Sequence, residues 1–449
     1  MLARHRVVIL GGGFGGLYAT RRLRAAPVEV TLVDRHNYHL FQPLLYQVAT
    51  GSLSPGEIAA PLRGILSRQR NSRVLLGEVQ DIDPVAKRVF LAGGEACAYD
   101  SLIVAVGSQG NYFGHADWQR WAPDLKSVEE ATEVRHKIFY AFEAAERFCA
   151  PPAACPWLTF AIVGAGPTGL ELAGALAEIA RDTLRHDFRA IRPEDARIVL
   201  LEGSPRVLPT YPADLSVKAE RALRRLGVQV RTGVHVVEVD GDGVTLQAEG
   251  RTERLPAKTV LWAGGVRLVP FGRTLARRTG AETDRTGRLK VEPDLTLRPY
   301  PDIYVVGDLA LAMGADGQPL PGLAPVAMQE GAYAAKAIRR RVEGEAPPPP
   351  FRYMDKGTMA VIGRGAAVAD IFGFHVSGFP AWLLWLFVHL MYLVQFQSRV
   401  LVFIQWGFQY LTFSRGARLI TGSTPSDLTA RRPAAAPAAD APAQMKRTA

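Results

Sequence analysis

Cysteine is the scarcest chemically informative residue in this sequence, with only three among 449 positions. Cys97, Cys149 and Cys155 are too few for a disulfide scaffold, and no two of them have the CxxC spacing of a metal site. The low count fits a reducing cytosol, so we expect Cys149 and Cys155 to be buried thiols. No metal centre is expected.

A long apolar run is missing at the N-terminus, and acidic residues are fewer than basic ones. The apolar stretch 7–10 is too short for a secretory signal, so we expect no export signal. Lys plus Arg is 53 and Asp plus Glu is 43, which gives a formal net charge of +10. That balance suits nucleic acid, an anionic membrane surface or phosphate-bearing ligands. Because no basic stripe interleaved with aromatics occurs, no nucleic-acid partner is expected.

The remaining composition describes a folded chain of two or three domains. The hydrophobic share is 48% and the charged share is 21%, which excludes general disorder. VVILGGGFGGLYATRRL, from residue 7, resembles FAIVGAGPTGLELAGAL, from residue 160. Each copy is an apolar strand, a GxGxxG turn and a helix, followed by a strand that ends in an acid. The sequence therefore predicts an α/β fold with two Rossmann-like dinucleotide-binding domains.

The first glycine turn contains Gly11, Gly13 and Gly16. The first glycine permits a tight turn, the second lets the backbone approach a pyrophosphate, and the third lets helix and strand pack closely. The helix N-terminus offers free N–H groups and the positive end of its dipole to phosphates. Asp34 ends the next strand, where a carboxylate can bind the hydroxyls of an adenosine ribose. The combination predicts a bound dinucleotide.

The second glycine turn repeats the pattern with Gly164, Gly166 and Gly169, and Glu202 is its acid. An acid here favours NAD(H), because it would repel the 2′-phosphate of NADP(H). Arg206 lies close in the sequence and would soften that preference. The alternative interpretation is that Glu202 is merely a solvated strand end.

Two dinucleotide folds in one chain imply two dinucleotides, and we expect FAD paired with NAD(H). Gly307 and Asp308 end a further apolar strand, and this pair resembles the Gly-Asp pair that holds the ribityl and pyrophosphate part of FAD in two-dinucleotide flavoproteins. No cysteine lies in 34–51 or in 156–341, so no thiol pair is available there for disulfide exchange. That absence excludes the dithiol disulfide reductases.

The sequence resembles the bacterial type II NADH dehydrogenases, single-subunit NADH:quinone oxidoreductases that do not pump protons. The stretches that carry the resemblance are 37–53, 166–178, 200–209, 261–266, 305–310, 324–331 and 353–364. The resemblance implies a glutathione-reductase-like architecture. It also implies that a hydride passes from NADH to FAD and that two electrons then pass to a membrane quinone.

The resemblance assigns roles to individual residues. It implies that FAD is held by Gly11, Gly13, Gly16, Asp34, Val79, Gly107 and Asp308. It implies that NADH is held by Gly164, Gly166, Gly169, Glu202 and Gly264. The catalytic residues that it implies are Glu171, Gln329 and Lys356.

Three of these assignments have alternatives. Glu171 is the candidate for proton supply or quinone positioning, and we expect it on the first turn of its helix, where it could instead only stabilise the dipole. The family's quinone motif AQxAxQ reads APVAMQ here. Pro325 thus replaces an amide that could hydrogen-bond a quinone carbonyl, while Gln329 remains. For Lys356, the alternative is a surface lysine.

Residues 379–413 form an aromatic segment with a single formal charge. We expect two helices lying in a membrane interface, with lipid contacts through 379–418. The tryptophans expected at that interface are Trp382, Trp385 and Trp406. The cations expected at the lipid headgroups are Arg399, Arg415 and Arg418. A dimer interface and a transmembrane hairpin are the alternatives.

The predicted division of the chain follows from these motifs. Its segments are an FAD-binding domain in two parts, 1–150 and 291–345, an NAD(H)-binding domain, 157–290, a membrane-anchoring domain, 351–422, and a disordered tail, 423–449. We expect a peripheral, monotopic protein on the cytoplasmic face of the inner membrane, and a homodimer stays open. The alternative functions are a sulfide:quinone or ferredoxin-type pyridine-nucleotide reductase and a low-turnover redox sensor.

Overall fold

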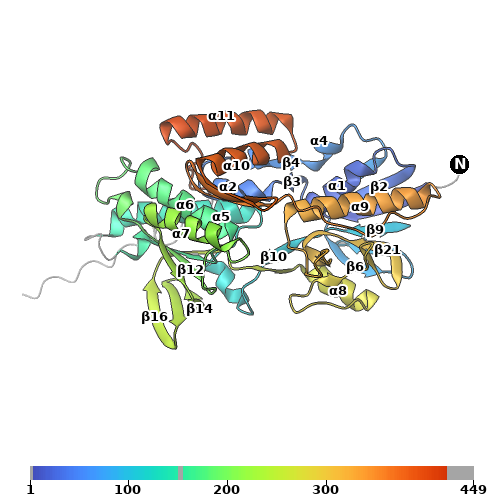
Figure 1. Cartoon of the computed structure of the whole chain (residues 1–449), viewed down its shortest axis with the longest axis horizontal. Coiled ribbons are helices and arrows are strands. Elements are labelled where there is room, and N and C mark those ends of the chain that lie inside the picture. Colours follow the sequence, from blue (N-terminus) through green and yellow to red (C-terminus); the bar gives the residue numbers. More distant parts are fainter. Residues whose placement is uncertain (1–3, 150–154, 422–449) are drawn as a thin grey trace, which may run out of the picture.

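The computed structural model describes residues 4–149 and 155–421. The chain forms two lobes that lie side by side, and two C-terminal helices run along one side of the molecule (Figure 1). The tail predicted for 423–449 lies outside the described residues.

The first lobe is built on a six-stranded sheet with the strand order β20-β21-β9-β1-β2-β5. The strands are β1 His5–Leu10, β2 Val28–Asp34, β5 Ser72–Leu76, β9 Ser101–Val104, β20 Thr296–Leu297 and β21 Tyr300–Val305. All neighbours pair in parallel except β20, which runs antiparallel to β21. Since β21 pairs with β9, segments far apart in the sequence share this sheet.

Both faces of the first sheet are covered, which explains why β1 is an unbroken apolar run. Val7 and Ile9 pack toward the helices α1, Phe14–Arg22, and α9, Ala324–Val342. Val8 and Leu10 pack on the opposite side. That side is formed by the antiparallel strands β6 Val79–Asp83, β7 Arg88–Leu91 and β8 Ala96–Ala98 and by helix α8 Pro270–Thr279.

The second lobe contains a parallel four-stranded sheet with the order β13-β12-β11-β17. Its strands are β11 Thr159–Val163, β12 Arg197–Glu202, β13 Gln229–Thr232 and β17 Thr259–Trp262. One face packs on the helices α5 Val128–Phe148, α6 Pro167–Glu178 and α7 Ala213–Arg225. The other face packs near the antiparallel strands β14 His235–Asp240, β15 Gly243–Ala248 and β16 Arg251–Pro256. The predicted pair of Rossmann-like folds is confirmed.

The C-terminal part packs on the second lobe. Its elements are β23 Thr358–Gly363, β24 Ala366–Ile371, β25 Phe374–Gly378, α10 Phe379–Tyr392 and α11 Phe396–Thr412. Strand β23 lies so close to α6 that a Cβ on Gly174 would be 1.7 Å from the carbonyl oxygen of Ile362. One continuous core runs from Phe160 in the second lobe to Trp385 in α10. Among the residues that the structure describes, no helix is both long enough and apolar enough to cross a membrane.

The remaining elements are short. They are α2 Leu45–Ala49, α3 Pro55–Ile58, α4 Leu62–Leu66, β3 Tyr38–Leu40 with β4 Ala59–Pro61, β10 Ser108–Gly110 with β18 Val266–Leu268, and β19 Leu289–Lys290 with β22 Ala310–Leu311. The antiparallel pair β10–β18 joins the loop after β9 of the first sheet to the segment after β17 of the second.

The expectation of two buried thiols at Cys149 and Cys155 is wrong, because these residues form a disulfide. Helix α5 ends next to Cys149, and the chain returns against the same helix at the short turn Pro156–Leu158, so the two Cα atoms lie 5.6 Å apart. Cys97 is a free, buried thiol.

Candidate functional site

The two glycine turns have the same backbone geometry. Gly11 has φ 99° and Gly164 has φ 97°, a region that favours glycine. A Cβ on Gly16 would lie 1.8 Å from the carbonyl oxygen of Gly11, and a Cβ on Gly169 would lie 1.9 Å from that of Gly164. Helix and strand can therefore approach this closely only with glycine at these positions.

The middle glycine of each turn leaves an open space in front of a helix. Gly13 caps α1 and Gly166 caps α6, and neither cap is closed by a side-chain hydrogen bond. A Cβ on either glycine would meet no atom within 4 Å. The first amides of both helices thus face free space, which fits the pyrophosphate of a dinucleotide.

The two acids that end the following strands are held in equivalent positions. Asp34 Oδ2 accepts a hydrogen bond from the amide of Gly12 at 2.5 Å, and Glu202 Oε2 accepts one from the amide of Ala165 at 2.7 Å. Each carboxylate also accepts the amide two residues further on. Glu202 is therefore fixed at the rim of its glycine turn and is not a freely solvated strand end.

Arg206 does not face a ligand in this arrangement. Its guanidinium donates to the carbonyl oxygens of Tyr211 and Pro209 at 2.9 and 2.7 Å. Two of its N–H groups are thus engaged, which does not support the expectation that Arg206 softens the preference for NAD(H). Gly264, by contrast, lies directly at the second turn: a Cβ on Gly164 would be 2.9 Å from its Cα.

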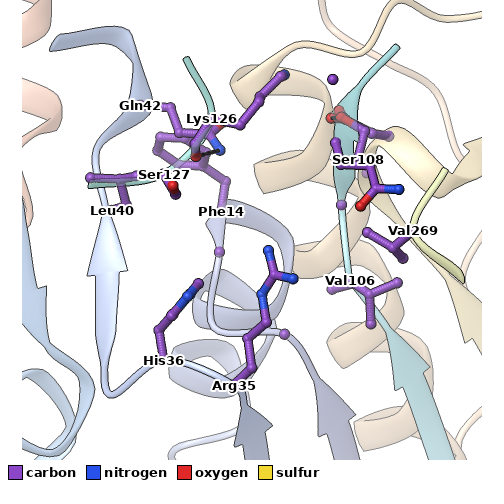
Figure 2. Close-up of a pocket in the computed structure, with 18 of the residues that line it drawn as sticks. Phe14, Arg35, His36, Leu40, Gln42, Val106, Ser108, Lys126, Ser127 and Val269 are labelled. Carbon is purple, nitrogen blue, oxygen red and sulfur yellow. Dashed lines mark hydrogen bonds between the residues drawn. The ribbon is translucent and has the colours of Figure 1, made fainter. Parts of the chain in front are cut away.

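A cleft of about 970 Å³ extends from the first glycine turn toward the second lobe. In Figure 2 its labelled side chains surround an open space, with Arg35 and His36 at one end and Gln42 and Lys126 at the other. The predicted residues that line it are Gly11, Gly13, Asp34, Val79, Gly107, Asp308 and Glu171. Gly16 lies beneath the turn, and the predicted residues that the cleft does not reach are Gly164, Gly166, Gly169, Glu202, Gly264, Gln329 and Lys356.

Two residues that the sequence motifs did not identify support Asp308. Ser108 donates to Asp308 Oδ2 at 2.5 Å and also lines the cleft. Glu330 is 1% exposed, accepts the amide of Gly307 at 2.6 Å, and has its pKa raised by burial to about 8. Only the position of Glu330 beside Gln329 could have drawn attention to it in the sequence.

A second cavity, of about 140 Å³, lies between α6 and the C-terminal helices. Its aromatic wall consists of Trp382, Trp385, Trp406, Tyr410 and Phe413. Its polar wall consists of Gln47, Glu171, Glu178, Asp182, Arg364 and Arg415. Tyr46 and Glu171 line both this cavity and the large cleft, so they form a wall that the two spaces share.

Glu171 is the fifth residue of α6, so the expectation that it lies on the first turn is wrong. A carboxylate beyond the first turn interacts only weakly with the helix dipole. The notable feature of Glu171 is therefore its position between the two cavities. Its Oε1 accepts the amide of Val361 at 3.4 Å. Burial raises the pKa of Glu171 to about 8, which keeps the carboxyl group protonated at neutral pH.

The second cavity ends at a buried ion pair. Arg415 is only 8% exposed, and its Nη2 lies 3.0 Å from Glu178 Oε2. The expectation that Arg415 lies at lipid headgroups is therefore wrong, because the chain after α11 turns inward. Arg418 pairs with Asp187 instead of standing free. Burial raises the pKa of Glu178 and lowers that of Arg415, so desolvation opposes the pair.

The three tryptophans expected at the membrane interface face inward. Trp385 is 1% exposed and stacks on His389 with ring centroids 4.2 Å apart. Trp406 Nε1 donates to Gln47 Oε1 at 2.7 Å. Trp382 also lines the second cavity. The expectation is wrong for Trp385, which is buried, whereas Trp382 and Trp406 are half-buried. Composition identifies an amphipathic segment but does not show on which of its faces each ring lies.

The outward face of α10 and α11 is apolar. The large apolar side chains exposed on α10 are Phe379, Leu383, Phe387 and Met391, and those on α11 are Phe396, Val400, Leu401, Phe403, Ile404, Phe408, Tyr410 and Leu411. Pro380, Gln397 and Thr412 are exposed as well. Phe396 is 77% exposed and Leu411 is 78% exposed, values that are unusual for such residues in a soluble surface. The two helices run together along one side of the molecule in Figure 1.

Gln329 and Lys356 lie together but away from Glu171. The Gln329 amide donates to the carbonyl oxygen of Met354 and accepts its N–H, both at 3.0 Å. Lys356 is exposed, and its Nζ lies 3.1 Å from the hydroxyl of Tyr392 on α10. Pro325 occupies the first turn of α9, where an N–H has no partner within the helix, so proline costs nothing there.

Comparisons with known proteins agree with this architecture. Residues 5–331 match the family described as pyridine nucleotide-disulphide oxidoreductase, and residues 356–415 match the family described as NDH2 C-terminal domain. The chain is 44% identical over 424 residues to the type II NADH:quinone oxidoreductase Ndh of Mycobacterium tuberculosis, covering 93% of this chain and 90% of that protein.

Solved structures show the same fold at lower identity. NDH2 from Plasmodium falciparum, in complex with NADH, superposes with a TM-score of 0.82 at 20% identity and covers 92% of this chain and 99% of its own. The sulfide:quinone oxidoreductase of Aquifex aeolicus superposes with a TM-score of 0.70 at 17% identity, covering 88% of this chain and 91% of its own. At these identities the likeness concerns the fold alone.

Proposed function

Because the chain belongs to the type II NADH:quinone oxidoreductases of the pyridine nucleotide-disulphide oxidoreductase family, we propose that it oxidises NADH and reduces a membrane quinone through FAD, without pumping protons. One observation carries the proposal furthest. Tyr46 and Glu171 form a wall shared by the large cleft and by an aromatic cavity beneath the apolar helices. A cofactor on one side and a quinone ring on the other would be separated by little more than these side chains.

The large cleft fits FAD. Its open glycine turn provides an anion site for the pyrophosphate. The fixed Asp34 provides an acceptor for ribose hydroxyls, and the Ser108–Asp308 pair provides a further polar contact. The residues that would hold FAD are Gly11, Gly13, Gly16, Asp34, Val79, Gly107 and Asp308. When bound, FAD supplies the chemistry that accepts a hydride from NADH and returns two electrons to a quinone.

The second glycine turn fits NADH. The residues that would hold it are Gly164, Gly166, Gly169, Glu202 and Gly264. Glu202 is fixed beside the amide of Ala165, where its charge would repel a 2′-phosphate, and Arg206 is engaged with carbonyl oxygens. These contacts favour NADH over NADPH.

The second cavity fits a quinone ring. Trp382, Trp385 and Trp406 offer apolar faces for stacking, and Glu171 offers a protonated carboxyl group at neutral pH. We assign Glu171 the role of giving a proton to the quinone. Gln329 and Lys356 would act indirectly, by holding the segment 353–356 against α9 and α10.

The alternative reductases are less well supported. A sulfide-oxidising site needs redox-active cysteines beside the flavin, yet neither Cys97 nor the Cys149–Cys155 disulfide lines the large cleft or the second cavity. A ferredoxin-type reductase or a low-turnover sensor has no need of an aromatic cavity covered by an exposed apolar helix pair. Those two features together favour a lipid-soluble acceptor.

Rapid mixing tests the proposed function. NADH is expected to bleach the absorbance of the bound flavin, and a short-chain ubiquinone or menaquinone analogue is expected to restore it within the time of one turnover. Flavin that is reduced by NADH but reoxidised only by oxygen or ferricyanide would contradict the proposal. Comparing the two analogues also identifies the preferred quinone.

We propose that the apolar face of α10 and α11 attaches the protein to the bilayer surface as a peripheral, monotopic protein on the cytoplasmic face of the inner membrane. Lys356 and Arg399 lie at the corner between the two helices, where Arg399 donates to the carbonyl oxygen of Leu393 at 2.7 Å. These cations suit anionic headgroups. The predicted division of the chain into domains is kept in this proposal, with 351–422 as the anchoring part.

Replacing Phe387, Phe403 and Leu411 by Gln is expected to release the protein from anionic vesicles in a flotation assay. These side chains point outward, so the loss removes apolar area in contact with lipid and leaves the cavity intact. The control is Val217→Gln on α7, which is also exposed and should stay vesicle-bound. If the triple variant still floats with the vesicles and a dimer of the wild type dissociates in the triple variant, the apolar face joins two copies of the chain instead of contacting lipid.

A further inference from the structure

The polar side of the second cavity contains a row of carboxylates that extends well beyond Glu171. Glu171, Glu178 and Asp182 all line the cavity, and Ala175 lies between the first two. Positions seven residues apart fall on one face of an α-helix, and the methyl group of Ala175 leaves space between the carboxylates. After Glu178 the helix continues as a π-helical turn, Ile179–Thr183, which brings the exposed Asp182 to the solvent end of the row.

Strand β23 and the turn that follows it hold two of these carboxylates in place. The amide of Val361 donates to Glu171 and the amide of Arg364 donates to Glu178. Seven helical residues span about 10.5 Å and three strand residues span about 10 Å, so the two amides match the spacing of the two carboxylates. Both carboxyl groups are thereby fixed toward the same cavity.

Arg415 fixes Glu178 from the other side. Its Nη2 lies 3.0 Å from Glu178 Oε2, and its Nη1 donates to the carbonyl oxygen of Thr50 at 3.4 Å. The groups that face Glu171 and Glu178 from neighbouring elements are Tyr46, Tyr211, Asp182, Arg364 and Arg415. Water molecules in the part of this cavity that the quinone ring leaves free would connect these groups.

The overall reaction requires a proton from water. NADH, one proton and a quinone give NAD⁺ and a quinol: the hydride brings both electrons and one hydrogen, and the second hydrogen is taken up as H⁺. Resting on the proposed function, we propose that Glu178 relays this proton from Asp182 to Glu171, with Arg415 as its positioning residue. Each carboxyl group receives one proton and passes one on, so none changes its state over a full cycle.

The relay gives a reason for burying a charged pair whose desolvation outweighs its mutual attraction. A structural ion pair at this place could be replaced by apolar side chains without loss of stability. A proton carrier could not, because it must remain able to gain and lose a proton inside the cavity. The Glu178 carboxyl group is therefore a candidate catalytic group for quinone reduction, in addition to Glu171.

Glu178→Gln is the decisive variant. We expect the reoxidation of bound flavin by a short-chain ubiquinone analogue to slow about tenfold or more, with the quinone KM and the reduction by NADH unchanged. The solvent deuterium isotope effect should increase, and added formate and the Glu178→Asp variant should each restore part of the rate.

The matched control is Asp187→Asn. Asp187 pairs with Arg418, which follows α11 as Arg415 does, and Asp187 lines neither cavity. The Asp187→Asn variant should therefore behave as the wild type does. If Glu178→Gln loses its flavin, the double variant Glu178→Gln/Arg415→Met, which leaves no unpaired charge, is measured in its place and should show the same slowing.

Two outcomes overturn different claims. If the wild type reduces the quinone and both Glu178 variants do so at the same rate with the same isotope effect, the relay is wrong and the proposed function stands. If the wild type itself does not pass electrons to the quinone, the proposed function fails. Equal slowing in Asp187→Asn would assign the effect to the C-terminal segment and would also defeat the relay.

Discussion

Glu171→Gln is expected to slow quinone reduction about a hundredfold while changing flavin reduction by NADH less than about twofold. The carboxyl group lines both cavities, and burial raises its pKa to about 8, so it carries a proton at neutral pH. Glutamine keeps the shape and can still accept the amide of Val361, so only the transferable proton is lost. Stopped-flow measurement of the two half-reactions separates them.

The same group predicts a pH dependence. Below about pH 8 Glu171 is protonated and can donate, and above it the carboxylate has lost the proton, so quinone reduction should fall as the pH rises through that value. The control is Glu133→Gln, an exposed carboxylate on α5 that lines neither cavity and should match the wild type. Equal slowing of both half-reactions in Glu171→Gln would contradict a role in proton supply.

Arg415→Met is expected to lower the free energy of unfolding by about 3–5 kcal/mol. The substitution leaves Glu178 buried without its cation and also removes the donor to the carbonyl oxygen of Thr50. Adding Glu178→Gln to this variant should recover most of the loss, because the unpaired charge then disappears. Chemical denaturation followed by flavin and tryptophan fluorescence measures both variants.

Arg418→Met provides the comparison for that experiment. Arg418 pairs with Asp187 at the surface, where both side chains are about a third or more exposed, so its loss should cost no more than about 1 kcal/mol. If Arg415→Met were as mild as Arg418→Met, the pair with Glu178 would not be buried in solution, and the inward course of the chain after α11 would be wrong.

The parts of the molecule that local motifs specify could be predicted from the sequence. Each glycine turn needs three particular residues within a short stretch, and each acid follows on the next strand, so the contacts of Asp34 and Glu202 follow from spacing. The same local logic predicted the two Rossmann-like folds, since apolar runs such as that of β1 are buried on both faces.

The misassigned residues depend on contacts between distant segments. Nothing near Arg415 in the sequence shows that it reaches Glu178 across 237 positions, and composition could not show that Trp385 faces the core while Phe387 faces outward. The polar wall of the second cavity has the same origin, because it is assembled from α2, α6, the segment after β23 and the chain after α11. Such a site becomes visible only when those elements are packed together.

We propose that the quinone lies in the second cavity, behind the wall formed by Tyr46 and Glu171. Photolabelling of the vesicle-bound holoenzyme with an azido-quinone, followed by peptide mapping, locates the bound quinone. The labelled peptides are expected to contain Trp385 or Trp406, and excess unlabelled quinone is expected to suppress the labelling. Quinone-protected labelling confined to the segment around Gln329 and Lys356, with none at the tryptophans, would contradict this proposal.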